Sequence, residues 1–178
     1  MNPYTLLEKY TQGNPELLRI LTGHSEAVRD KALAIIRAKS LDVDREFVAQ
    51  AAMLHDIGVV RVDAPSISCF GTAPYIRHGV EGRTILEGEG LPRHALVCER
   101  HTGSGLSIRQ IEEQTLPLPS RDMIPLSLEE KLICYADKFF SKSRDLRAEK
   151  PLERIMAQME AHGSEAYARF MEMHSLFG

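Results

Sequence analysis

Apolar residues recur at three- and four-residue spacings along almost the whole chain, and this helical periodicity constrains the fold more than any other feature. Strict alternation of apolar and polar residues is scarce, as are β-branched runs between turn residues. The chain has 178 residues, of which 43% are hydrophobic, so it is long enough for one domain with a substantial core. We therefore predict an all-α fold, a single globular helical bundle over residues 1–178.

Capping residues and glycines predict where the first helices begin and end. Asn14 and Pro15 open a helix that we expect Gly23 to end, and a second helix follows directly. Asp44 is expected to cap a third helix. Gly58 is expected to close that helix in the left-handed conformation that glycine tolerates best.

Two capping boxes mark later helices. Ser107 with Gln110, and Ser127 with Glu130, have the residue types and the spacing of this motif. Further helices are expected over residues 75–87, 92–101, 152–159 and 166–173, with a long loop at 61–75 and a proline-rich connection at 116–125.

Charge and composition exclude several classes of function. The formal net charge is −3, so there is no strong basic field to collect nucleic acid, and we expect no nucleic-acid partner. No apolar run approaches the roughly 20 residues of a membrane helix. Residues 1–10 also lack the pattern of a signal peptide, which predicts a cytoplasmic protein with no membrane partner. Cys69, Cys98 and Cys134 are too few and too far apart for a disulfide framework or a zinc knuckle.

Six residues of the types that bind metal ions lie on the expected helices: His24, His55, Asp56, His78, His101 and Asp137. His55 and Asp56 directly follow an apolar helical run, residues 51–54. Burying an imidazole and a carboxylate side by side is unfavourable by several kcal/mol unless partners or a cation satisfy both. A bound metal ion is the simplest explanation of the joint pattern.

This pattern resembles the HD superfamily of metal-dependent phosphohydrolases, whose hallmark is an early His, a His-Asp doublet and a distant Asp. Leu54-His-Asp-Ile-Gly58 is similar to the widespread form of the doublet motif, and Tyr135-Ala-Asp-Lys138 looks like the closing motif. The resemblance covers roughly residues 23–143 and implies an HD-domain bundle, on which helices in 151–176 would pack. His78-Gly79 and His101-Thr102-Gly103 stand where two-metal members supply extra ligands, and the chain most resembles the bacterial subgroup that splits diadenosine tetraphosphate symmetrically.

A mixed set of imidazole and carboxylate ligands suits iron or manganese, with zinc, cobalt or nickel as further options. If the Asp56 carboxylate binds two metal ions at once, we expect the ions to lie about 3.5 to 4 Å apart. The first would be held by His24, His55, Asp56 and Asp137, and the second by Asp56, His78 and His101. The expected nucleophile is a metal-bound hydroxide, with Asp56 and Lys138 as the catalytic residues.

Phosphate recognition requires positive charge and hydrogen-bond donors near the metal ions. The candidates by position are Arg83, Arg100, Thr102 and Lys138. Where related sequences often carry a lysine after the doublet motif, this chain has Val59, so no substrate contact is expected at that position.

The expected activity is hydrolysis of a nucleotide or a dinucleoside polyphosphate, with a small phosphate ester as the partner. Two alternatives remain open: a one-metal nucleoside monophosphate phosphatase in which His78 and His101 contact substrate, and a non-catalytic nucleotide-binding module. We expect Met156, Met159, Met171 and Met173 to belong to the core or to a homodimer contact, and His94, His162 and His174 to lie on the surface.

Overall fold

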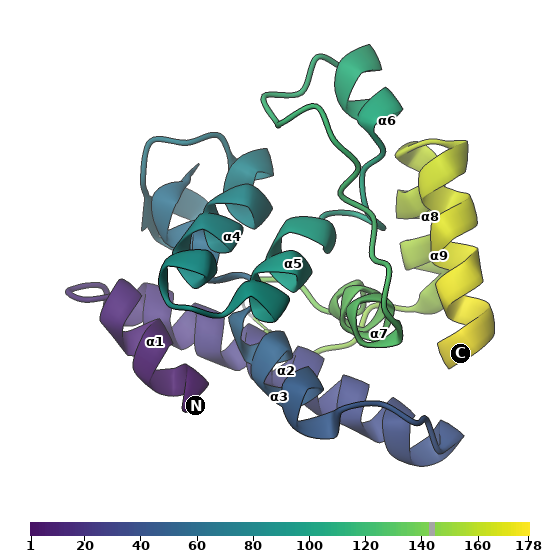
Figure 1. Ribbon diagram of the computed structural model, residues 1–178, viewed down its shortest axis with the longest axis horizontal. Helices are drawn as coiled ribbons and strands as arrows, with labels where there is room; N and C mark the ends of the chain where they lie inside the picture. Colours follow the sequence, from purple (N-terminus) through teal and green to yellow (C-terminus); the bar gives the residue numbers. More distant parts are fainter. Residues whose placement is uncertain (143–144) are drawn as a thin grey trace.

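The computed structural model describes residues 1–142 and 145–178, and it confirms the predicted helical bundle (Figure 1). Residue 143, where the family resemblance was expected to end, lies outside the described residues. The α-helices of the described residues are α1 (Pro3–Tyr10), α2 (Pro15–Lys39), α3 (Arg45–Leu54), α4 (His78–Gly88), α5 (Pro92–Arg100), α6 (Ile108–Glu113), α7 (Leu128–Asp137), α8 (Leu152–Ala161) and α9 (Ser164–Phe177). In these residues no helix is long and apolar enough to cross a membrane.

The core has two main parts. One lies between α2, α3, α7 and the C-terminal helices α8 and α9, with Leu132, Ile155 and Phe170 fully buried. The other joins α1, the end of α3 and the α4–α5 pair around Leu7 and Ile85. Figure 1 shows α7 near the middle of the view, with α4 and α5 on one side of it and α8 and α9 on the other.

Helix α2 is continuous, so the prediction that Gly23 ends a helix is wrong. Asn14 caps the start of α2 by accepting a hydrogen bond from the backbone N–H of Leu17, and the chain stays helical to Lys39. A Cβ atom at Gly23 would lie 2.6 Å from Leu146 Cδ1. Gly23 therefore serves tertiary packing, where Leu146 lies against the helix.

Gly58 has a similar role, and its predicted left-handed conformation is also wrong. Helix α3 ends at Leu54, and Gly58 lies within a 3₁₀ turn, η1 (Ile57–Arg61), without a positive φ. A Cβ atom here would lie 2.0 Å from the carbonyl oxygen of His78 and 2.2 Å from the backbone nitrogen of Gly82. Gly58 thus allows the backbone of α4 to approach the residues that follow the His-Asp doublet.

One capping box is complete and the other is only half formed. Ser107 and Gln110 exchange both expected hydrogen bonds at the start of α6. At the start of α7, the Ser127 hydroxyl accepts from the N–H of Glu130, as predicted. The Glu130 carboxylate, however, accepts from the N–H of Leu126 and pairs with Arg100. An ion pair from a neighbouring helix has replaced the second half of the motif.

The segment predicted as a long loop at 61–75 contains a small hairpin that the sequence analysis missed. Its strands β1 (Asp63–Ala64) and β2 (Cys69–Phe70) pair antiparallel around the 3₁₀ turn η2 (Pro65–Ile67), and η3 (Tyr75–Arg77) leads into α4. Strands of two residues are too short to show an alternating pattern. The proline-rich segment at 116–125 contains no helix, as predicted.

The C-terminal helices α8 and α9 form where they were predicted and complete the core. Met159 and Met173 are buried, and Met156 and Met171 pack partly buried against the same core. The core interpretation of the four methionines is therefore confirmed.

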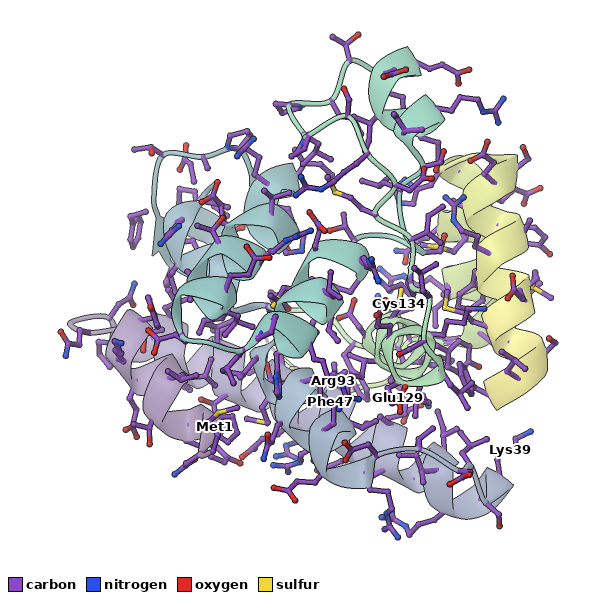
Figure 2. The ribbon with its side chains drawn as sticks, viewed as in Figure 1. Met1, Lys39, Phe47, Arg93, Glu129 and Cys134 are labelled. Atoms are coloured by element: carbon purple, nitrogen blue, oxygen red, sulfur yellow. The ribbon has the colours of Figure 1, made fainter. Side chains whose placement is uncertain are left out.

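Of the three histidines predicted to lie on the surface, only His162 is exposed. His94 is partly buried with its ring edge against Phe47, and His174 is partly buried in a hydrogen bond with the Tyr135 hydroxyl. The ring of Phe47 also contacts Arg93, which lies on α5 and is labelled with Phe47 in Figure 2. The Arg93 guanidinium lies 3.9 Å from the centroid of the Phe47 ring.

Candidate metal centre

The fold brings all six predicted ligand residues to one place, although they come from five helices. His24 lies in the middle of α2, and Asp137 is the last residue of α7. His55 is the C-cap of α3, and Asp56 follows it. His78 is the first residue of α4, and His101 is the C-cap of α5. Five of the six sit at helix ends, where a helix can present a side chain to its neighbours.

The first ligand group comprises His24, His55, Asp56 and Asp137. His24 Nε2 lies 3.2 Å from Asp56 Oδ2 and 3.0 Å from Asp137 Oδ1. His55 Nε2 lies 3.1 Å and 3.4 Å from the same two oxygens. Two imidazole nitrogens and two carboxylate oxygens thus converge on one point.

The second group shares Asp56 and adds two histidines. The other carboxylate oxygen, Asp56 Oδ1, lies 3.6 Å from His78 Nε2 and 3.4 Å from His101 Nε2. The two Nε2 atoms are themselves 3.1 Å apart. Each oxygen of Asp56 therefore faces a different pair of histidines, which is the arrangement of a bridging carboxylate.

Three of the histidines are held in one orientation by the same local device. The Nδ1 atoms of His55, His78 and His101 lie 2.7, 2.8 and 2.7 Å from the backbone carbonyl oxygens of Ala52, Tyr75 and Cys98, each three residues earlier. A carbonyl oxygen can only accept, so in the neutral ring Nδ1 carries the proton and Nε2 has the lone pair that a metal ion would bind. The ligand nitrogen of each ring is thus fixed by its own helix end.

Burial and charge act in opposite directions on the groups of this cluster. Burial alone would raise the pKa of Asp56, but the Lys142 ammonium and the protonated His55 ring hold it well below its usual range. Burial alone would lower the pKa of His55, but Asp56 and Asp137 raise it to about 9. Burial and the neighbouring His101 lower the pKa of His78 to about 3. The cluster therefore keeps its carboxylates ionised and collects positive charge around them.

The unsatisfied atoms show that metal ions fit the site. His55 Nε2 and both oxygens of Asp56 are buried and form no hydrogen bond of good geometry with any described residue, although the Lys142 ammonium forms an ion pair with Asp56 Oδ2. Buried polar atoms are rarely left in this state. All ligand atoms within each group lie within 4.8 Å of one another. Two groups that share one carboxylate match a two-ion site with imidazole and carboxylate ligands.

Two lysines lie directly beside the ligands, and the sequence analysis found only one of them. Lys138, in the predicted closing motif, has its Nζ 2.8 Å from Asp137 Oδ2 and 3.1 Å from the carbonyl oxygen of His101. Lys142 has its Nζ 2.6 Å from Asp56 Oδ2 and 3.3 Å from the Tyr75 hydroxyl. No motif marks Lys142, which follows Lys138 by four residues beyond the end of α7.

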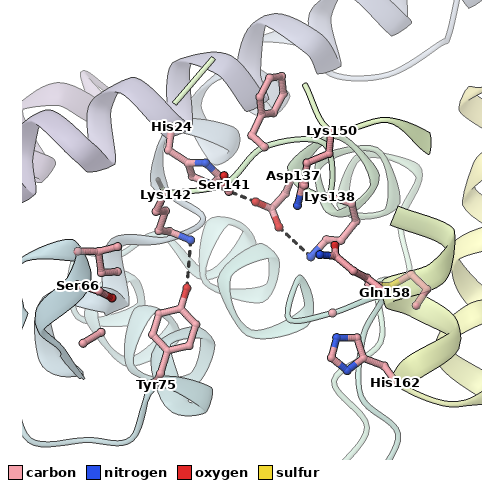
Figure 3. Close-up of a pocket in the computed structure, with 15 residues that line it drawn as sticks. His24, Ser66, Tyr75, Asp137, Lys138, Ser141, Lys142, Lys150, Gln158 and His162 are labelled. Carbon is pink, nitrogen blue, oxygen red and sulfur yellow. Dashed lines mark hydrogen bonds and ion pairs between the residues drawn. The ribbon is translucent and has the colours of Figure 1, made fainter. Parts of the chain in front are cut away.

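A cavity of about 800 Å³ opens onto the metal centre (Figure 3). His24, Asp137, Lys138 and Lys142 line it next to the ligands. Ser66 and Tyr75, from the hairpin side, form one wall, and Gln158 and His162, at the end of α8, form the opposite wall. The volume lies within the range that binding sites for small molecules usually have.

Of the predicted phosphate-binding residues, the structure places only Lys138 on this cavity. Arg83 pairs with Glu99 at 2.5 Å and with Glu87, and Arg100 pairs with Glu130 at 3.0 Å. Thr102 turns its hydroxyl toward Gly79 on α4, while its neighbour Gly103 lines the cavity. Both arginines are held by glutamates that the sequence pattern did not connect to them.

Helix α9 holds the loop that follows His101. The Arg169 guanidinium donates to the carbonyl oxygens of Ser104 and Gly105 at 3.2 and 2.8 Å. The Ser104 hydroxyl donates to the carbonyl oxygen of Ala166 at 2.8 Å. These contacts link the C-terminal helices to the segment that carries a predicted metal ligand, His101, and a residue of the cavity wall, Gly103.

Comparisons with known proteins agree with this geometry. The family model described as "HD domain" matches residues 21–141. An uncharacterized protein of Methanocaldococcus jannaschii is 39% identical over 114 residues, which are 64% of this chain and 59% of that protein. No solved structure matches the chain.

Two further relatives are named tRNA (cytidine(56)-2'-O)-methyltransferase. The protein of Picrophilus torridus is 30% identical, and the match covers 94% of this chain and 47% of that protein. The protein of Thermoplasma volcanium is 31% identical, and the match covers 86% of this chain and 40% of that protein. The chain therefore spans about half the length of the curated relatives it matches. None of these three relatives is named as a diadenosine tetraphosphate hydrolase.

Proposed function

The chain belongs to the HD domain family, and from this premise we propose that it is a metal-dependent phosphohydrolase acting on a nucleotide or a dinucleoside polyphosphate. One observation carries the proposal: two buried ligand groups share Asp56 and border an open cavity. Two ions held in this way are typical of sites that displace a group at phosphorus. Iron or manganese is the proposed metal, since the ligands are imidazoles and carboxylates.

When bound, the ions supply a Lewis acid for a phosphate oxygen and a water molecule that loses its proton near neutral pH. The protein's own residues supply orientation and charge. Asp56 would contribute one carboxylate oxygen to each ion site, and the carbonyl partners of His55, His78 and His101 fix the orientation of rings whose Nε2 atoms would bind the ions. The Lys138 ammonium, at the edge of the cavity, is placed to donate to a phosphate oxygen.

A one-metal phosphatase for nucleoside monophosphates is the second candidate. The first ligand group is complete by itself, with four residues, whereas the second has three and leaves His78 and His101 in contact with each other. In that case both histidines would contact substrate. Metal stoichiometry separates the two candidates: about two equivalents per chain support the bridged pair, and one equivalent contradicts it.

The first test combines metal content with a panel of substrates. Protein purified without added metal or chelator is assayed for bound metal and for hydrolysis of nucleoside monophosphates, nucleoside polyphosphates, diadenosine tetraphosphate and tRNA. We expect about two equivalents of metal and cleavage of a polyphosphate. The panel includes tRNA because two relatives are named as tRNA methyltransferases. The net charge of −3 gives this chain no strong basic field that would attract tRNA. Bound metal without turnover on any substrate would favour a non-catalytic nucleotide-binding module.

Asp56→Ala is the matching variant, because it removes the one carboxylate common to both groups. We expect it to abolish metal retention and hydrolysis together. Asp42→Ala, at an exposed position, is the control and should keep both. If Asp56→Ala retains wild-type activity, the proposed site is wrong.

A further inference from the structure

Three lysine side chains face the cavity beside the metal centre: Lys138, Lys142 and Lys150. In Figure 3, Lys142 lies on one side of Asp137, and Lys138 and Lys150 lie on the other. The positive charge is therefore spread along the cavity next to the ligands.

The three ammonium groups differ in their partners. Lys142 pairs with Asp56 at 2.6 Å, and Lys138 pairs with Asp137 at 2.8 Å. Lys150 forms no ion pair or side-chain hydrogen bond with any described residue, although its backbone N–H donates to the carbonyl oxygen of Phe139. Burial lowers the pKa of Lys150, and the attraction of Asp137 does not offset this effect. An anion in the cavity would supply a counter-charge.

Metal binding increases this excess of positive charge. Asp56 and Asp137 are the only carboxylates that pair with Lys142 and Lys138 in the described part of the chain, and both are ligands in the proposed metal sites. Their negative charge is then shared with the metal ions. A single phosphate group carries about −1.5 to −2 at neutral pH. Two ions with three ammonium groups are better matched by a chain of phosphates, which carries more charge over a greater length.

We propose that Lys150, together with Lys138 and Lys142, forms a subsite for the phosphates beyond the one that reacts, so that the substrate class is nucleotides with a polyphosphate chain. This inference rests on the proposed function, because the reacting phosphate is taken to lie at the metal centre. Lys150 is a specificity-determining residue in this scheme. It binds a part of the substrate that a nucleoside monophosphate lacks.

The location of Lys150 in the chain agrees with a role in selectivity. The family match ends at residue 141, whereas Lys142, Lys150 and the α8 wall of the cavity come after it. Lys150 directly precedes Pro151, the N-cap of α8, so the helix that forms the far wall also places the lysine. The metal ligands belong to the matched domain, and the proposed polyphosphate subsite belongs to the segment that follows.

The test compares Lys150→Gln with the wild type and with Lys39→Gln, a control at the exposed end of α2. Each protein is loaded with Mn²⁺ and titrated by calorimetry with a methylene-bridged nucleoside tetraphosphate analogue, and separately with inorganic phosphate. A lost charge-assisted hydrogen bond weakens binding by about tenfold to a hundredfold. We therefore expect Lys150→Gln to raise the Kd of the analogue at least about tenfold, with less than about a twofold change for phosphate, and Lys150→Arg to restore most of the affinity.

Equal weakening for both ligands, or no weakening for the analogue, would overturn the subsite. Kinetics on a hydrolysed polyphosphate give a second readout, since a subsite beyond the reacting group should raise KM more than it lowers kcat. The outcomes also separate this inference from the proposed function. A wild type that hydrolyses nothing on the panel contradicts the proposed activity, while binding of the analogue still decides the subsite.

Discussion

Replacing Gly58 with alanine is expected to damage the metal centre without touching any ligand. The new Cβ atom would lie 2.0 Å from the carbonyl oxygen of His78 and 2.2 Å from the backbone nitrogen of Gly82. Both neighbours are backbone atoms of α4, so no flexible side chain can turn away. The segment after Asp56 and the helix that carries His78 must therefore separate.

The size of the effect follows from these distances. Ordinary contact requires at least 3.4 Å, so the two segments must move apart by about 1.4 Å. His78 Nε2 is already 3.6 Å from Asp56 Oδ1, and such a movement would take it out of the second ligand group. Overpacking of this kind destabilises by roughly 1–3 kcal/mol, and contacts with backbone favour the upper end. For a domain of this size, about 3 kcal/mol lowers Tm by roughly 6–12 °C.

Thermal unfolding and metal analysis of Gly58→Ala measure the two consequences. We expect the lower Tm together with a fall in bound metal from about two equivalents toward one. Gly88→Ala, at the other end of α4, is the matched control: no atom lies within 4 Å of its new Cβ, and an alanine within a helix is favoured by about 0.5–1 kcal/mol. If Gly58→Ala unfolds at the wild-type temperature and keeps its metal, the close approach of α4 does not set the geometry of the site.

Two further predictions concern thiols and pH. Burial raises the pKa of the Cys69 and Cys134 thiols to about 11 from an ordinary 9. Both thiols should therefore react about a hundredfold more slowly than free thiols in a disulfide-exchange assay at pH 8. Fast reaction in the native protein would contradict their burial. Hydrogen bonds from Arg109, Ser107 and Arg169 hold the pKa of Glu165 at about 2, below its ordinary 4.5. The carboxylate therefore stabilises the fold above pH 4.5, and this stabilisation is lost as the pH falls toward 2. The stability difference between wild type and Glu165→Gln in urea should shrink from pH 7 to pH 3, and a constant difference would refute the assignment.

The helices were predictable because their signals are local. Asn14, Asp44 and Ser107 cap the helices that the sequence assigned to them, and the helical periodicity fixed the fold class. The errors came from glycines whose role depends on contacts distant in sequence. The absence of a side chain at Gly23 makes room for Leu146, and its absence at Gly58 makes room for the backbone of α4. The residues next to each glycine in the sequence give no signal of these contacts.

The clustering of the six candidate ligand residues was predictable for a different reason. A histidine and an aspartate after an apolar run must find partners, and the family motif supplied the other four positions. The phosphate contacts had no comparable constraint. Arg83 and Arg100 look suitable by position, yet Glu99 and Glu130 hold them. Lys142 and Lys150 reach the cavity through tertiary folding alone, so no spacing rule could identify them.

The residues of the proposed metal sites lie far apart along the chain, and this has a consequence for how the protein would unfold with metal bound. His24 and Asp137, which meet in the first group, are 113 residues apart, and His78 and His101 in the second are 23 apart. An ion that binds both members of such a pair acts as a reversible cross-link, comparable to a disulfide that spans most of the chain. Because the folded chain binds the ion and the unfolded chain has dispersed ligands, free metal pulls the equilibrium toward the folded state by mass action. In a protein whose three cysteines are all free, a metal ion bound at the proposed centre would add a cross-link between the first long helix and the C-terminal half.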